Sequence, residues 1–143
     1  MSRFFFETDP PADVPPKFGG PPDVLVYFLS LAFSTRYGSI HPLSQLALLM
    51  RAEHKINMTP LTTFADRDVE EPADDRELRR AWQDAAPLAE TLRQVNDVLA
   101  SGDPRLAELT EETPDLAARL RDLQLIVEQA AEHGARVRMT FEL

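Results

Sequence analysis

Residues 24–33 read VLVYFLSLAF and contain the longest apolar run of the chain. Asp23 precedes this run and can cap a helix, because its carboxylate accepts the unpaired amide protons of a first turn. A helix that is apolar on nearly every face must be buried on all sides. We therefore expect residues 24–33 to form either the central helix of a bundle or a helix buried by oligomerisation, with Gly38 beyond its end. A buried strand over residues 24–29 is the alternative.

Two later segments, residues 78–99 and 116–130, carry heptads of apolar residues, which predict two helices with one apolar stripe each. Pro87 interrupts the first segment and should kink or split that helix near Asp84. Joined by a short connection, the two helices should pack antiparallel. The stripe positions are Leu78, Ala81, Ala85, Leu88, Leu92, Val95 and Leu99 in the first segment, and Leu116, Leu120, Leu123, Val127 and Ala130 in the second.

A further helix is expected from Pro42 to about Asn57, since proline suits a first turn. Residues 59–75 are expected to form a loop. Within residues 66–77 there are seven acids and two arginines around Pro72, so this segment buries little apolar area and should be a solvated or mobile connector.

The two ends of the chain are the best candidates for strands. Residues 136–143 alternate strictly, with Val137, Met139 and Phe141 on one face, and period two is typical of a half-buried strand. An isolated strand is not stable. Because the aromatic residues 3–8 are the other candidate, we expect the termini to pair with each other or with another subunit.

With 143 residues, the chain suits a single domain with an added arm. We predict a mainly α fold, a small bundle of four to five helices with a minor β element formed by the N- and C-terminal segments. Six of the twelve prolines fall in the first 22 residues, so residues 1–22 should form an extended, proline-rich arm. Residues 23–143 would then be the helical domain, with the acidic connector at about 59–75 and the strand at 136–143.

The net charge of −9 arises in the C-terminal part, where residues 61–143 hold 19 acids and ten bases. Such a surface disfavours nucleic acid and anionic membranes as partners and attracts a basic protein. No apolar run reaches the ~18–20 residues of a membrane span, and no secretory signal is recognisable. The chain has no cysteine, which fits a cytoplasmic location.

No nucleophile elbow or phosphate-binding glycine loop occurs, so the sequence favours a protein that is not an enzyme, and it assigns no catalytic residue. The candidate metal ligands are Met50 and His54, which with Met58 share an i, i+4, i+8 spacing suited to copper or haem. Methionine more often fills a core than binds metal, so we predict neither a metal nor a cofactor.

Neighbouring residues of a strand point to opposite faces, so the phenylalanines at positions 4–6 cannot all point inward. We take Phe4, Phe5, Phe6 and Phe18 as candidates for binding a partner, with the arm lying either across another subunit or on its own bundle.

The predicted function is a non-catalytic interaction or accessory subunit that binds a protein, including a second copy of itself. The first alternative is a small ligand- or metal-binding helical enzyme built around Glu53, His54 and His41. The second is an acidic mimic of nucleic acid that binds a basic partner.

Overall fold

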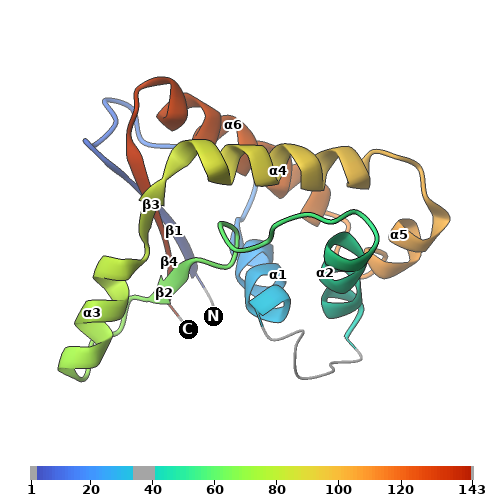
Figure 1. The fold of residues 1–143 in the computed structure, drawn as a ribbon, viewed down its shortest axis with the longest axis horizontal. Coiled ribbons are helices and arrows are strands. Elements are labelled where there is room, and N and C mark those ends of the chain that lie inside the picture. Colours follow the sequence, from blue (N-terminus) through green and yellow to red (C-terminus); the bar gives the residue numbers. More distant parts are fainter. Residues whose placement is uncertain (1–2, 34–40, 143) are drawn as a thin grey trace.

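The computed structural model describes residues 3–33 and 41–142, which contain six helices and four strands. The fold is therefore mixed α/β, with helices packed against a small sheet (Figure 1), which corrects the prediction of a mainly α bundle of four to five helices. In chain order the elements are β1 (Arg3–Asp9), α1 (Asp23–Phe33), α2 (Pro42–Ala52), β2 (Phe64–Asp66), α3 (Pro72–Arg80), β3 (Trp82–Asp84), α4 (Ala85–Leu99), α5 (Pro104–Leu109), α6 (Leu116–Glu132) and β4 (Arg136–Glu142).

Strand β4 is the centre of the sheet. It pairs antiparallel with β1 along its whole length, so the two ends of the chain meet within one molecule as the alternation predicts. Its other edge is shared by two three-residue strands: β3 pairs antiparallel with its first half and β2 pairs parallel with its second half. Strand β2 lies in the segment that we expected to be a loop, and β3 lies in the segment that we expected to be helical.

The alternation along β1 and β4 separates an apolar face from a charged one. The pairs Phe4↔Phe141 and Phe6↔Met139 lie on the face that packs against the core. On the opposite face each charged residue stands across from an opposite charge: Arg3↔Glu142, Glu7↔Arg138 and Asp9↔Arg136. A shift by one residue would exchange the two faces, so this pattern fixes the register.

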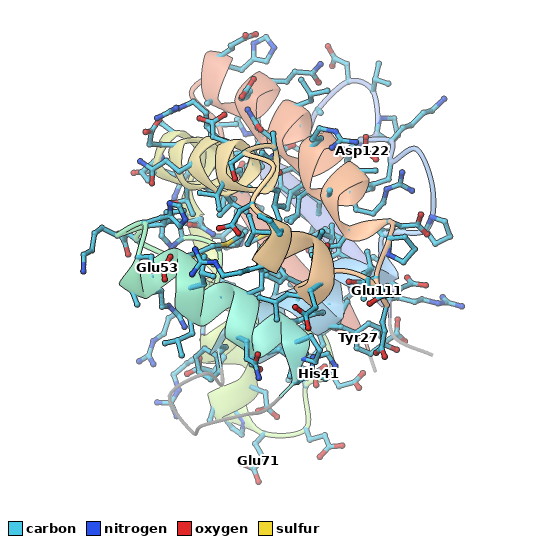
Figure 2. The ribbon with its side chains drawn as sticks, turned by 90° about the vertical axis from the view of Figure 1, so that its right-hand side faces the viewer. Tyr27, His41, Glu53, Glu71, Glu111 and Asp122 are labelled. Carbon is cyan, nitrogen blue, oxygen red and sulfur yellow. The ribbon has the colours of Figure 1, made fainter. Side chains whose placement is uncertain are left out.

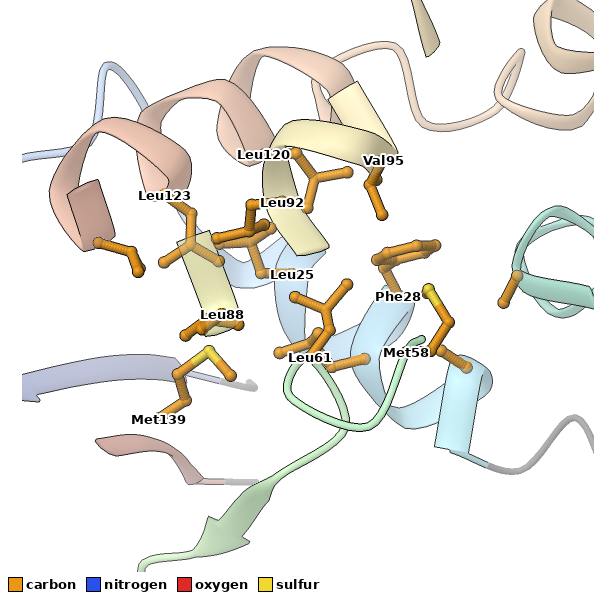
Figure 3. Packing of buried hydrophobic residues seen from close by; sticks show 14 of the residues in the cluster. Leu25, Phe28, Met58, Leu61, Leu88, Leu92, Val95, Leu120, Leu123 and Met139 are labelled. Atoms are coloured by element: carbon orange, nitrogen blue, oxygen red, sulfur yellow. The ribbon is translucent and has the colours of Figure 1, made fainter. Parts of the chain in front are cut away.

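The apolar stretch at residues 24–33 is helix α1 and not a strand. Figure 3 shows its Leu25 and Phe28 gathered with Leu92 and Leu120 of the two heptad helices, and all four side chains are fully buried. The expected burial on all sides is incomplete, because Tyr27 is 54% exposed. Gly38, expected to end this helix, lies outside the described residues.

The two heptad segments pack as predicted, with α4 and α6 running antiparallel (Figure 1). Asn96 on α4 reaches across the pair, where its amide donates to the Leu120 carbonyl at 3.1 Å and to Gln124 Oε1 at 2.7 Å. The apolar stripes of both helices form a large part of the core, together with residues of α1 and α2.

The expected helix over residues 78–99 is split into α3, β3 and α4. A proline clashes with the carbonyl of the residue four positions earlier, which for Pro87 is Gln83. Residues 82–84 are therefore extended and pair with β4, and α4 begins at Ala85. Leu78 on α3 and Ala81 just after it are thus separated from the five stripe positions on α4.

Helix α2 ends at Ala52 and does not reach Asn57. Lys55 has a φ of 56°, in the left-handed region, and the chain turns there so that the Ile56 amide donates to the Met50 carbonyl. The expected connector at 59–75 contains β2 and the start of α3.

Candidate functional site

The aromatic arm lies on its own chain. The Phe18 ring packs edge-on against Phe4, with 5.9 Å between ring centroids, and the Gly19 amide donates to Asp122 Oδ2 of α6 at 2.9 Å. A Cβ atom on Gly20 would come within 1.9 Å of Nη1 of Arg119, so only glycine lets the arm pass there without a shift. These contacts explain the Gly19–Gly20 pair between the prolines.

Of the other candidate phenylalanines, Phe6 packs against the core and Phe5 lies on the charged face of the sheet. The guanidinium of Arg67 lies 4.3 Å above the Phe5 ring centroid and donates to Glu7 Oε1 at 3.3 Å. None of the four phenylalanines is among the large hydrophobic side chains that the described chain exposes.

The candidate metal ligands do not share a helix face. Helix α2 ends before His54, whose side chain is exposed, whereas Met50 and Met58 are buried in the core. In the part of the chain that the structure describes, no group of three His, Asp or Glu residues is placed to hold a metal ion.

The predicted polar cluster of His41, Glu53 and His54 is not assembled either. Figure 2 shows His41 and Glu53 at opposite ends of α2. His41 caps the start of this helix, where its Nδ1 accepts the Leu43 amide at 3.1 Å. His41 and Glu53 therefore cap opposite ends of α2 and do not form one site.

Glu53 belongs to an ion-pair network that joins α2 to α5. Arg105 donates to Glu53 Oε1 at 2.8 Å and to Asp103 Oδ2 at 2.8 Å. Side-chain hydrogen bonds from Arg105 lower the pKa of Glu53 and that of Asp103 below their ordinary values. The same bonds raise the pKa of Arg105. Both carboxylates are thus neutralised within the chain.

A different group of carboxylates is paired with arginines only in part. Residues 66–77, which we call the acidic lobe, comprise the end of β2, a loop and most of α3 (Figure 1). Helix α3 buries none of its residues. Its start is fixed by Asp74, whose Oδ2 accepts the amides of Glu70 and Glu71 at 3.0 Å each. Of its acids, Asp75 and Glu77 form exposed ion pairs with the arginines that end α3.

A hollow of about 240 Å³ opens where the acidic lobe meets the sheet. The Phe64 and Phe141 rings pack edge to face on one side of it, with their centroids 5.4 Å apart. Within the described residues, Asp66, Asp68 and Asp74 form no ion pair with any Lys, Arg or His. The remaining lining residues are Phe33, Thr62, Ala65 and Glu77, beside the two rings and these three acids.

A second hollow of about 210 Å³ lies between α1, the start of α2 and the segment after α5. Tyr27, His41 and Glu112 contribute the polar groups of its lining, together with Thr113, whose buried hydroxyl has no hydrogen-bond partner among the described residues. In Figure 2 Tyr27 and His41 lie on the same side of the molecule.

Sequence reasoning identified residues 66–77 as acidic but not as the wall of a hollow. The sequence predicts a loop at Phe64, and the alternation places Phe141 only on one face of a strand. The two rings meet because β2 pairs parallel with β4, and a three-residue strand is too short for its alternation to be recognised.

Comparisons with protein-family models, with curated proteins and with solved structures yield no match to this chain. Among the described residues, no helix has both the length and the hydrophobicity that crossing a membrane requires.

Proposed function

We propose that this chain is a non-catalytic interaction subunit that binds a basic segment of a protein partner through the acidic lobe. One observation carries this proposal: α3 is a helix with a fixed start whose side chains the rest of the chain does not bury. A helix that is polar all round contributes nothing to the core. Its exposed side chains are therefore accessible to another molecule.

The distribution of ion pairs supports the lobe as the binding surface. On α4, Arg93 lies between Glu90 and Asp97, and on α6 Arg119 pairs with Asp122. Acids on the heptad helices are thus partly neutralised by neighbouring arginines, whereas Asp66, Asp68 and Asp74 beside the hollow form no ion pair among the described residues. A concentrated negative surface raises the association rate of a basic partner.

This distribution also separates the proposal from its alternatives. A mimic of nucleic acid needs a continuous track of charge, and the arginines of α4 and α6 interrupt it. An enzyme built on His41, Glu53 and His54 needs these groups close together, and α2 holds two of them at opposite ends. Self-association stays a prediction, which a monomer mass from light scattering would contradict.

The proposal is tested with a fluorescent octa-arginine peptide and two charge-matched variants of the full chain. The first variant, Glu70→Gln with Glu71→Gln and Asp75→Asn, neutralises exposed acids of the lobe. The control, Glu108→Gln with Glu111→Gln and Glu112→Gln, neutralises three exposed acids on and after α5. If each lost contact costs about 0.5 kcal/mol, the lobe variant should bind about tenfold more weakly.

Fluorescence anisotropy at several salt concentrations provides the readout. We expect the control variant to bind octa-arginine about as tightly as the unmodified chain does. The affinity of the unmodified chain should fall as salt rises. Equal losses in both variants would mean that only the net charge matters, and would overturn the proposal.

A further inference from the structure

The hollow beside the acidic lobe combines two kinds of group that together recognise an organic cation. The faces of Phe64 and Phe141 offer negative quadrupole potential, and Asp66 and Asp74 offer full negative charge. Asp74 Oδ2 accepts two backbone amides, and Asp66 Oδ1 accepts the Asp68 amide at 2.9 Å. These bonds hold both carboxylates in place.

The same chain already uses this combination twice to hold an arginine. Arg67 lies over the Phe5 ring and pairs with Glu7. Arg138 lies 4.7 Å from the centroid of the Trp82 ring and donates to Glu7 Oε2 at 2.9 Å. In each case an aromatic ring and a carboxylate hold one guanidinium. The hollow has the rings and the carboxylates, and none of the described residues that line it is an arginine.

The size and spacing of the groups narrow the ligand further. Ligand pockets for drug-sized molecules usually measure about 300–1,000 Å³, so the hollow of about 240 Å³ suits a single side chain. None of the acids that line it belongs to a group of described residues that could hold a metal ion. This arrangement suits an extended cation rather than a metal ion.

We infer that the hollow receives an arginine side chain from the partner. The planar guanidinium can stack on an aromatic ring while its N–H groups donate to carboxylates, a match that the compact ammonium of lysine does not provide. The inference rests on the proposed function in that the arginine belongs to the basic segment bound by the lobe.

The test uses the intact ¹⁵N-labelled chain and a single-residue probe, Nα-acetyl-arginine methylamide, with the neutral citrulline derivative as its control. In a chemical-shift titration we expect saturable shifts at residues 64–66 and 141, and about tenfold weaker binding of citrulline. The variant Asp66→Asn with Asp74→Asn keeps the oxygen acceptors and removes the charges. It should bind arginine about fivefold more weakly at an unchanged unfolding midpoint.

A matched variant, Glu108→Gln with Glu111→Gln, removes two exposed charges outside the lobe that do not line the hollow and should keep the arginine affinity. Equal binding of citrulline, or shifts spread over other acidic surfaces, would overturn the inference. If the chain binds octa-arginine but the arginine probe causes no shifts at the hollow, the inference is overturned and the proposed function stands. If the arginine probe causes shifts at the hollow while octa-arginine binds the lobe and control variants equally, the inference is supported and only the proposed function is contradicted.

Discussion

Helices α3 and α4 are separated by only four residues, Ala81 and the three of β3, yet the fold uses them in opposite ways. Helix α4 buries six residues against α6, α1 and the sheet, whereas α3 buries none. The stability of α4 comes from its apolar stripe, and that of α3 from Asp74, its terminal pairing with arginines and its attachment to β3. The difference separates a helix that the fold needs from one available for binding.

The largest effect that distinguishes the two helices is expected from truncating one leucine on each. Leu92 on α4 is fully buried, so Leu92→Ala should lower the free energy of unfolding by about 2–5 kcal/mol. Leu78 on α3 is only half-buried, so Leu78→Ala should cost less than about 1 kcal/mol. Urea denaturation of both variants gives the two values, and equal losses would show that the heptad is continuous in solution.

A smaller effect is expected where the arm crosses α6. The side chain of Arg119 is only 12% exposed, so it has little room to avoid a methyl group at position 20. Gly20→Ala should destabilise the chain by about 1 kcal/mol. A methyl group on Gly19 would lie 3.3 Å from Arg119. Because alanine also restricts the unfolded chain, Gly19→Ala should be close to neutral.

Thermal unfolding of the two glycine variants checks this prediction. A larger loss for Gly19→Ala than for Gly20→Ala would mean that the arm does not cross α6 as described.

The smallest effect concerns the exposed network of Arg105 and depends on pH. Arg105 lowers the pKa of Glu53 and of Asp103, whose ordinary values are 4.5 and 3.8. Lowered carboxylate pKa values add stability that is fully present above the ordinary values and is lost as pH falls through the lowered ones. Arg105→Gln should therefore be slightly less stable than the unmodified chain at pH 7, with the difference vanishing in acid below the lowered pKa values of both carboxylates.

Urea denaturation between pH 7 and strong acid measures this difference. Arg121→Gln is the matched control, because Arg121 is exposed on α6 and pairs with no carboxylate in the residues that the structure describes. A difference for Arg105→Gln that persists in acid would assign its effect to packing instead of charge.

The elements that could be predicted are those with long, regular patterns. The alternation at Val137, Met139 and Phe141 located β4, and Pro87 located the break before α4. Strands β2 and β3 could not be predicted, because three residues show no reliable period and both form only where β4 offers an unpaired edge.

The candidate site shows the same limit. Its charge was visible in residues 66–77, since acids cluster along the sequence. Its aromatic part was not, because Phe64 and Phe141 come from distant segments that only the pairing of β2 with β4 brings together.

Hydrogen–deuterium exchange of the intact chain, with and without octa-arginine, tests most directly whether α3 is dispensable to the core and available to a basic partner. Amides of residues 72–80 should exchange much faster than those of residues 88–99 in the free chain, because few buried contacts oppose local opening of α3. With the peptide, protection should rise over residues 66–80 and stay unchanged over α4 and α6. Equal protection of α3 and α4 in the free chain, or peptide protection centred on α6, would contradict this account.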